Sequence, residues 1–256
     1  MASNAIAELK QRLLAEAQSV AGRVSKPADN FIKCRTNQGF ETPDGQYFEG
    51  SEGFECVIID FATTHEYYDQ EFSPSGKKPP ACVALGYDIA TLAPIPQSPD
   101  PQCTSCAMCP MNQWGSKGSG KACKNSRLLA LLPPVFDDED PLMYVLKVTR
   151  GSLKFFDGYV QKLATRYKTV PIGVVTRVTL NPNVTWSEQH FEVVRPLEDH
   201  EFETYMKRRD EAKSVLMTPP DLSGWTPPDG RRVIPIQQAP ALPAAKPAAR
   251  SWGTKK

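Results

Sequence analysis

The stretch from Cys103 to Arg127 constrains the fold more than any other part of the chain, because it has little with which to fold by itself. It reads CTSCAMCPMNQWGSKGSGKACKNSR and holds four cysteines within 21 residues, together with three glycines. Glycine loses more backbone freedom on folding than any other residue. Such a segment needs an additional source of folding free energy, and thiolates that share a metal ion supply one.

The spacing of the cysteines is typical of a metal site. Cys106 and Cys109 form a C-x-x-C turn that places two sulfurs on one side of a tight loop, and Cys123 returns 14 residues later. The fourth ligand is open between Cys103, which precedes the turn, and Cys82, which lies in an apolar run. Four thiolates at about 2.3 Å predict tetrahedral zinc. Because C-x-x-C-x-x-C spacing also occurs in iron–sulfur proteins, such a cluster is the less favoured alternative.

A phosphate-binding loop is the second interpretation of the same stretch. Residues 115–122, GSKGSGKA, match the pattern G-x-x-x-x-G-K, but Ala122 stands where a Ser or Thr would hold magnesium. The loop should also follow a buried strand and open a helix, whereas it lies between two cysteines. The sequence therefore disfavours nucleotide binding at this loop.

A nucleic-acid surface is the third interpretation. The formal net charge of the chain is +1, so binding to a polyanion requires local clustering of cations. Residues 101–136 contain no Asp or Glu, and they carry Lys117, Lys121, Lys124 and Arg127 around Trp114. Phosphates bind mobile cations, and unpaired bases stack on aromatic rings. Further candidates for the same surface are Tyr67, Tyr68, Lys154, Phe155, Tyr159, Lys162, Arg166 and Lys168.

The periodicity of the remaining sequence predicts an α+β domain built on a small β-barrel. Expected strands cover residues 54–62, 82–87, 127–136, 142–150, 173–180 and 190–197, with short strands between 31 and 53. Expected helices cover residues 3–22, 152–167 with Ser152 as the N-cap, and 199–217. The predicted organisation is an N-terminal helical segment at 1–30, a domain at 31–217 with a zinc element at 82–127, and a disordered Pro- and Ala-rich tail at 218–256.

Several classes of protein are disfavoured. No run of about 18 apolar residues would span a membrane, and no apolar export signal is evident, so we expect a cytoplasmic protein. The three histidines, His65 among them, are scattered, and no nucleophile–base spacing is informative. We therefore expect a protein that is not an enzyme.

The motifs also resemble a family. The segments FECVIIDFATTHEYYDQEF, KPPACVA, CPMNQWGS and GSGKACKNSRLLALL, in this order, resemble bacteriophage and prophage single-stranded DNA-binding proteins. The similarity covers roughly residues 50–195. It implies an OB-like β-barrel core with an inserted Cys-rich zinc element, peripheral helices, and a role in phage DNA replication or recombination in the host cytoplasm.

Carried over position by position, the resemblance implies specific site residues. It favours a metal set made of Cys82, Cys106, Cys109 and Cys123, which leaves Cys103 as an alternative ligand. It also implies strand contacts by Tyr67, Tyr68, Trp114, Lys121 and Lys124. One departure concerns the C-terminus, which reads ARSWGTKK and is basic where many replication proteins of this class end in an acidic tip.

The sequence thus predicts a sequence-tolerant binder of single-stranded DNA, with replication proteins as possible further partners. Cations from residues 117–127 would contact phosphates, and aromatic rings would contact bases. The alternative is a zinc-stabilised protein-interaction adaptor in transcription or replication. The adaptor would show no salt-dependent affinity for DNA.

Overall fold

Strand β4 (Phe54–Tyr67) organises the fold, which we describe from a computed structural model that covers residues 30–36, 38–70, 78–134 and 141–228. The strand is 14 residues long and rich in β-branched and aromatic side chains, as strands are. Its register shifts between Ile58 and Asp60, and such a bulge bends a strand. One strand can therefore take part in a strongly curved sheet.

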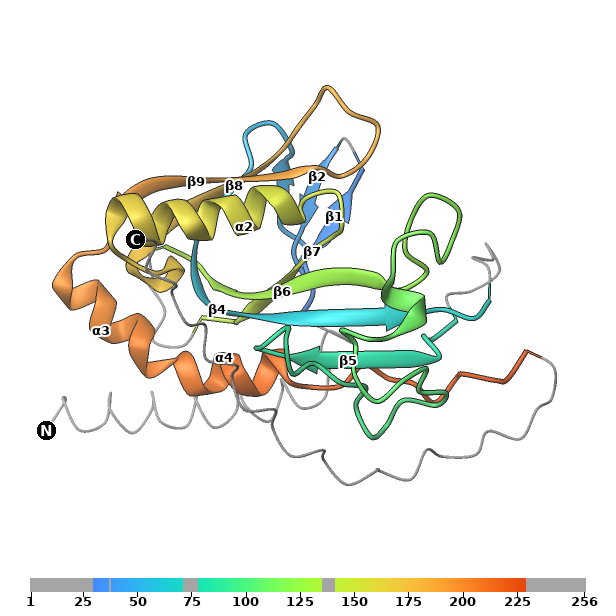
Figure 1. The fold of residues 1–256 in the computed structure, drawn as a ribbon. Coiled ribbons are helices and arrows are strands. Elements are labelled where there is room, and N and C mark those ends of the chain that lie inside the picture. The colour runs from blue at the N-terminus through green and yellow to red at the C-terminus, as the bar shows by residue number, and fades with distance from the viewer. Residues whose placement is uncertain (1–29, 37, 71–77, 135–140, 229–256) are drawn as a thin grey trace, which may run out of the picture.

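A six-stranded antiparallel sheet is built around β4 (Figure 1). Its strand order is β7-β6-β4-β8-β9, and β5 pairs with the end of β4. The other strands are β5 (Cys82–Gly86), β6 (Lys124–Leu132), β7 (Tyr144–Val148), β8 (Val174–Leu180) and β9 (Gln189–Pro196). This arrangement confirms the α+β class, and a curved antiparallel sheet is compatible with a barrel-like core.

A small antiparallel sheet precedes β4. It contains β1 (Lys33–Arg35), β2 (Gly39–Glu41) and β3 (Tyr47–Glu49). The chain then turns sharply into β4 at Gly53, whose φ is +69° and whose missing Cβ would lie 1.9 Å from the carbonyl oxygen of Val178. Only glycine fits this close approach without displacing the backbone.

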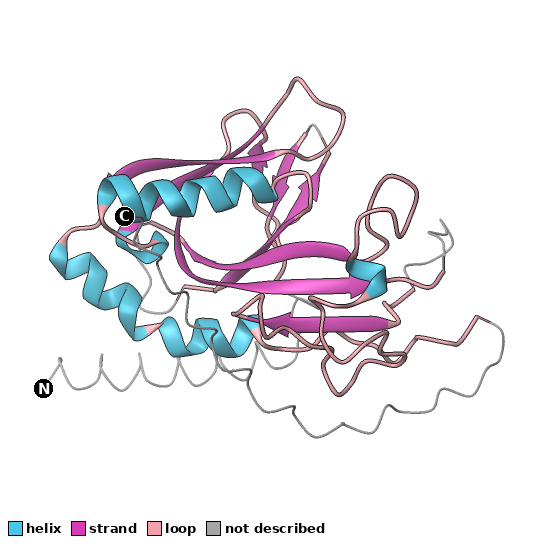
Figure 2. Ribbon diagram, in the orientation of Figure 1, coloured by secondary structure: helices cyan, strands magenta, loops and turns pink. Residues whose placement is uncertain are grey.

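Helices cover both faces of the large sheet (Figure 2). Helix α2 (Leu153–Lys162), which continues as a π-helical turn at Leu163–Tyr167, buries Phe156 and Tyr159 against the inner face. On the opposite face lie α3 (Asp199–Lys207) and α4 (Arg209–Leu216), which contribute Tyr205, Ala212 and Leu216 to a second core. Two short 3₁₀ turns lie at Pro110–Asn112 and Pro171–Gly173. Because both faces of the sheet are covered, consecutive residues are buried along most of β6 and in two stretches of β4.

The secondary-structure predictions are largely confirmed, with informative differences. Strand β4 continues five residues beyond the predicted end at residue 62, through HEY. The predicted helix at 199–217 is two helices that meet at Arg208, and three of its side chains, Tyr205, Ala212 and Leu216, are core residues. Residues 218–228, assigned from sequence to a disordered tail, are described, and Gln70 Nε2 donates to the carbonyl oxygen of Thr226 at 2.9 Å. The predicted helix at 3–22 and tail residues 229–256 lie outside the described residues.

Ser152 stands at the start of α2 as predicted, but its side chain makes no capping hydrogen bond. Its hydroxyl donates to the carbonyl oxygen of Ser187 at 3.2 Å and accepts from the backbone N–H of Gln189 at 2.9 Å. Ser187 lies in the β8–β9 connection, and Gln189 is the first residue of β9. The buried hydroxyl therefore ties that connection to the turn between β7 and α2.

Replacement of Ser152 with Ala is expected to lower the free energy of unfolding by about 1–3 kcal/mol, because the buried N–H of Gln189 loses its acceptor. Urea denaturation measures the change. Ser214→Ala is the matched control, since Ser214 is exposed on α4. Equal midpoints for the two variants would contradict the role given to Ser152.

A capping box lies at the start of α3, and its glutamate is expected to make the stability of the protein depend on pH. Glu201 accepts the backbone N–H of Glu198 at 2.8 Å and pairs with Arg195 at 2.7 Å. The hydrogen bonds from Arg195 and from that N–H lower the pKa of Glu201 to about 2. A carboxyl whose folded pKa is lowered stabilises the fold above its unfolded pKa, near 4.3, and loses this contribution as the pH falls toward 2.

Replacement of Glu201 with Gln should therefore destabilise the protein by about 1 kcal/mol at neutral pH, the usual size of a helix-cap effect. The difference from the wild type should shrink between roughly pH 4.5 and pH 2. Thermal unfolding across this pH range measures it. Glu203→Gln, at an exposed position on the same helix, should show little change at any pH.

Candidate functional site

Two cysteines flank Tyr67 at the end of β4. Cys82 opens β5 and is the direct partner of Tyr67, while Cys123 immediately precedes Lys124, the partner of Glu66. Because side chains alternate along a strand, Cys82, Tyr67 and Cys123 point to the same face of the sheet. The ends of three neighbouring strands thus present two thiols side by side.

The segment that carries the other cysteines folds back onto this face. The N–H of Cys106 donates to the carbonyl oxygen of Leu92 at 2.9 Å, and the N–H of Cys123 donates to that of Met111 at 2.8 Å. Cys106 also packs with Leu92 and Ala84 in a small core. Asn112 fixes the turn, since its Nδ2 donates to the carbonyl oxygen of Cys106 at 2.8 Å. The segment that carries Cys106 and Cys109 therefore forms a compact loop that packs on β5 and on the end of β4.

The structure brings all five predicted thiols into one neighbourhood, the thiol cluster: Cys82, Cys103, Cys106, Cys109 and Cys123. Burial, followed by the negative charge that neighbouring thiolates would add, raises the pKa of Cys106 and of Cys123 to about 12. The Cys103 thiol lies within hydrogen-bonding reach of Cys106 and Cys109, and its pKa is raised to about 12, first by burial and then by the hydrogen bond to Cys109. All seven cysteines of the chain are free thiols. Cys103 is thus as much a part of the cluster as Cys82.

No group of three or more His, Cys, Asp or Glu side chains within the described ranges converges in metal-binding geometry. The thiols are neighbours, but their sulfur atoms do not surround a common point where one ion could bind, so a zinc element is not shown. The chemistry of the donor set nevertheless fits zinc, because buried thiols with raised pKa values become favourable thiolates only when a cation neutralises them. The thiols of Cys34 and Cys56 lie elsewhere, on β1 and β4.

His65 lies on the same face as the thiol cluster, opposite Asn125 of β6. Its ring is 4% exposed, and burial, followed by the charges of Arg127 and Lys121, lowers its pKa to about 4. Its Nδ1 has no hydrogen-bond partner within the described residues. The imidazole is therefore neutral at physiological pH and packs as part of the sheet surface.

A glycine hairpin projects from the thiol cluster between Trp114 and Lys121. Gly115 and Gly118 have φ values of +87° and +58°, and the N–H of Gly115 donates to the carbonyl oxygen of Gly120 at 2.9 Å. The chain then leads into strand β6 rather than into a helix. This geometry differs from a phosphate-binding loop, which opens a helix.

Trp114 is the most exposed aromatic side chain among the described residues, at 69%. Two cations lie near its ring: the Arg150 guanidinium is 4.8 Å and Lys121 Nζ is 5.9 Å from the ring centroid. Lys124 Nζ lies in the same way 4.4 Å from the ring of Tyr68. Cation–π contacts of this kind hold long basic side chains beside aromatic faces.

The remaining predicted DNA contacts differ in accessibility. Lys117 and Lys124 are exposed, whereas Lys121 is half-buried and reaches Asn112 Oδ1 at 3.4 Å. Tyr67 and Tyr68 are half-buried as well. The Tyr68 hydroxyl donates to Glu66 at 3.1 Å, and burial followed by the charge of Glu66 raises its pKa. The exposed members of the predicted set are thus concentrated in the hairpin.

Arg127 has a different environment from the hairpin lysines. Its side chain is 9% exposed, and its guanidinium pairs with Asp157 of α2 at 3.3 Å. It fastens β6 to α2, and its charge is directed into the protein. Tyr159, named from sequence as a possible surface aromatic, is 4% exposed and belongs to the inner core.

Two residues of the surface were missed from sequence, Arg150 and Trp186. Both are exposed, and Arg150 contacts the ring of Trp114. The sequence signal for Trp186 is a large aromatic residue in the polar run NPNVTWSEQ. No spacing rule connects that run to the cysteine-rich stretch.

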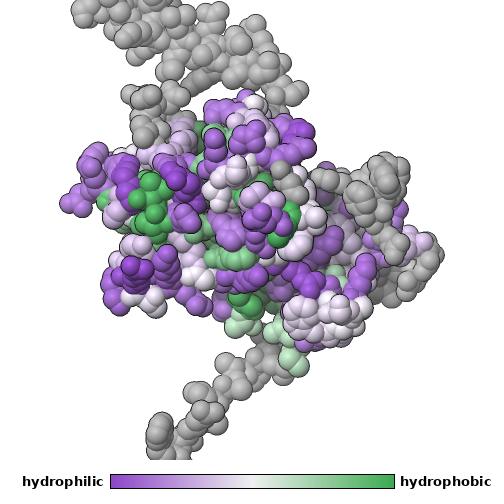
Figure 3. Space-filling view, turned by 90° about the horizontal axis from the view of Figure 1, so that it is seen from above, coloured by the Kyte–Doolittle hydropathy of each residue, from purple (hydrophilic) through white to green (hydrophobic). Residues whose placement is uncertain are grey.

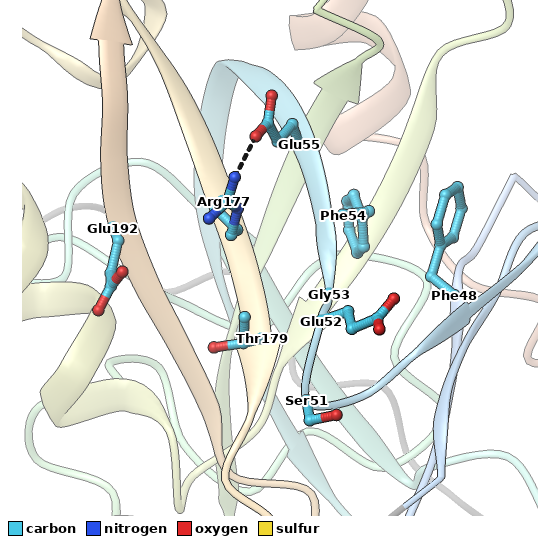
Figure 4. Close-up of a pocket in the computed structure, with 9 residues that line it drawn as sticks. All are labelled: Phe48, Ser51, Glu52, Gly53, Phe54, Glu55, Arg177, Thr179 and Glu192. Carbon is cyan, nitrogen blue, oxygen red and sulfur yellow. Dashed lines mark hydrogen bonds and ion pairs between the residues drawn. The ribbon is translucent and has the colours of Figure 1, made fainter.

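A hollow lies at the opposite end of β4 (Figure 4). It has a volume of about 730 Å³, and three glutamates line it, of which Glu55 pairs with Arg177 at 2.6 Å. The other two are Glu52 and Glu192. Carboxylates repel a polyanion, so we place the nucleic-acid candidate at the hairpin and not in this groove.

The face seen from above in Figure 3 is mainly hydrophilic, with small and separate hydrophobic patches. Dispersed apolar residues of this kind are normal on protein surfaces.

None of the described helices has both the length and the apolar character required to cross a membrane.

Comparison with known proteins assigns no family. No family model matches the sequence, and no curated protein or solved structure matches the chain. The resemblance to phage single-stranded DNA-binding proteins therefore stays a prediction.

Proposed function

We propose that the protein is a sequence-tolerant, non-enzymatic binder of single-stranded DNA that acts in phage DNA replication or recombination. The observation that carries the proposal is the exposed Trp114 ring with Arg150 and Lys121 beside it, on a hairpin free of carboxylates. An exposed indole with cations around it matches the two needs of an unpaired strand, which are stacking for the bases and positive charge for the phosphates.

The hairpin cations would bind phosphates by releasing counterions from the DNA. Lys117 and Lys124 are exposed and add further positive charge to this part of the surface. Since every base has a π-face, stacking on the indole does not depend on sequence. Binding would therefore be general for unpaired DNA and weak for duplex DNA, whose bases are not available.

Zinc is the cofactor that fits the thiol cluster. Cys82, Cys106, Cys109 and Cys123 would hold it, with Cys103 as the alternative ligand. The ion would supply folding free energy to the loop that presents the hairpin. The chemistry of the protein would then reside in the positioned side chains, and the metal would have a structural role.

The curved sheet supports an OB-like core. An OB-fold is a five-stranded and partly open barrel whose faces and loops bind single strands. Here β4 is long and contains a bulge, and the strand order of the sheet is β7-β6-β4-β8-β9. Helix α2 packs against β9. The hairpin then occupies a loop position at one end of such a barrel.

Binding to dT oligomers should weaken steeply with salt. If Lys117, Lys121 and Lys124 each contact a phosphate, their contribution to the slope of log K against log salt is about −2 for a single strand. Fluorescence anisotropy of labelled oligomers at several salt concentrations measures this slope. A variant with Lys117, Lys121 and Lys124 replaced by Gln should give a slope whose magnitude is smaller by about 2.

The same titration separates the proposal from its alternative. A wild-type protein without affinity for single-stranded DNA, or with a flat salt plot, would contradict the phosphate mechanism and favour the zinc-stabilised adaptor. Equal affinity for a duplex of the same length would contradict the stacking mechanism. A Glu203→Gln variant, which changes one exposed charge on α3, is the control for effects of net charge.

A further inference from the structure

The dipeptide Arg150–Gly151, in the turn between β7 and α2, lies between two exposed tryptophans. On one side, the Arg150 guanidinium is 4.8 Å from the centroid of the Trp114 ring. On the other side, a Cβ placed on Gly151 would lie 3.3 Å from both Cδ1 and Nε1 of Trp186. The indole of Trp186 therefore rests against the backbone of Gly151. Two aromatic rings far apart in the sequence flank a single cation.

Arg150 is itself held in place. A Cβ on Gly120 would lie 3.1 Å from Nη1 and 3.3 Å from Nη2 of Arg150, so the guanidinium fits between the hairpin backbone and Trp114. A side chain at position 120 would press on the guanidinium and displace it slightly. The fixed fork of the guanidinium is suited to binding phosphate.

Trp186 is presented by a firmly bonded connection. The N–H of Asn181 donates to the carbonyl oxygen of Glu188 at 2.9 Å, and its Nδ2 donates to the Glu188 carboxylate at 2.7 Å. The hydroxyl of Ser152 forms hydrogen bonds with the backbone of Ser187 and Gln189, which follow Trp186 in the chain. The Trp186 side chain nevertheless stays 52% exposed. The hydrogen bonds thus hold a large aromatic ring at the surface and do not bury it.

One carboxylate, that of Glu188, lies two residues from Trp186 in the sequence. The Glu188 carboxylate is 9% exposed and is engaged by Asn181 and His190, and Asp157 pairs with Arg127. Exposed Lys154 lies over the ring of Phe155, with Nζ 4.6 Å from its centroid. The cations near the two tryptophans therefore stay accessible, while the nearby carboxylates have partners within the protein.

We propose that Trp186 is a second base-stacking platform, and that Arg150 holds a phosphate of the same strand between Trp186 and Trp114. The inference rests on the proposed function, because it extends the surface for single-stranded DNA beyond the hairpin. The strand passes from Trp114 over Arg150 to Trp186. Affinity accordingly increases when an oligomer becomes long enough to reach both rings.

Oligomers of dT of increasing length test the second platform. On long oligomers, Trp186→Ala should lower the affinity about 5- to 30-fold, since the loss of one aromatic stack has this size. On the shortest oligomer that binds the wild type, the same change should have little effect. Trp186→Phe, which keeps a ring, should restore most of the affinity. Arg150→Gln should lower the magnitude of the salt slope by about 0.7, the value for one phosphate on a single strand.

Tyr87→Ala is the matched control, because Tyr87 is a 46% exposed aromatic residue that follows β5, away from the thiol cluster. If Trp186→Ala binds long oligomers as tightly as the wild type while Trp114→Ala is weakened, the second platform is wrong and the proposed function stands. If the wild type itself ignores single-stranded DNA, the proposed function fails. Equal losses at every oligomer length that Phe does not restore, together with a lower melting temperature, would show a structural role and overturn the inference.

Discussion

Replacement of Cys106 with Ser is expected to abolish metal binding and to unfold the loop from Cys103 to Cys123. The residue lies at the centre of the thiol cluster and contributes to the small core with Leu92. Structural zinc contributes about 10–16 kcal/mol in small zinc-binding peptides, more than the usual stability of a whole domain. The glycine hairpin would lose its support, and affinity for single-stranded DNA should fall by more than about 100-fold, because the cations and Trp114 would no longer be held together.

Metal analysis of the purified protein, together with limited proteolysis of the loop, measures the effect. The wild type should carry one zinc per chain, and the variant none. Cys34→Ser is the matched control, since Cys34 is a half-buried thiol on β1 outside the thiol cluster. Parallel replacement of Cys82 and of Cys103 identifies the fourth ligand. A metal-free wild type that folds normally and resists the protease would contradict the metal proposal, and a brown protein that contains iron would replace zinc with a cluster.

Replacement of Trp114 with Ala is expected to reduce the affinity for single-stranded DNA by about 10- to 100-fold, within the range for the loss of one base–aromatic stack. The change also removes the ring beside which Arg150 and Lys121 lie, so both cations lose a positioning contact. Stability should change little, because the indole is mainly exposed. Fluorescence anisotropy with dT oligomers, together with urea denaturation, separates the two effects.

Met108→Ala provides the control within the same loop. Met108 is 81% exposed and apolar, so its truncation removes surface area without removing a stacking ring. Trp114→Phe should keep a large part of the wild-type affinity. Unchanged affinity in Trp114→Ala would remove this ring from the site and leave the salt-dependent contacts as the sole basis of binding.

The strands and the grouping of the cysteines were predictable because their signals are local. Runs of β-branched residues gave β4, β8 and β9, and the hairpin of β6 with β7 followed from two apolar runs joined by a polar loop. The C-x-x-C spacing brought Cys106 and Cys109 together within a few residues. Cys82 joined them through strand pairing with Tyr67; the residues alone offered it as one of two candidates for the fourth ligand, and the resemblance favoured it.

The rest of the site depends on contacts between distant segments. Ser152 looked like a helix cap, yet its hydroxyl finds better partners 35 and 37 residues away. Arg127 counted as a surface cation, whereas the register of β6 directs it toward Asp157 of α2. Trp186 is adjacent to Gly151 because the β8–β9 connection folds onto the turn after β7. Composition and periodicity carry no information on such pairings.

The positions of Cys82 and Cys123 on the two strands that flank the end of β4 have a topological consequence. An ion bound by both residues would cross-link the chain and close a loop of roughly forty residues, which in the unfolded state costs about 4 kcal/mol of conformational entropy. A protease cut between Tyr87 and Gln102 would then leave two pieces that stay joined through the ion. The pairing of β4 with β6 and β8 also joins the pieces, so they should migrate together on a native gel and should separate at a lower urea concentration once a chelator is added.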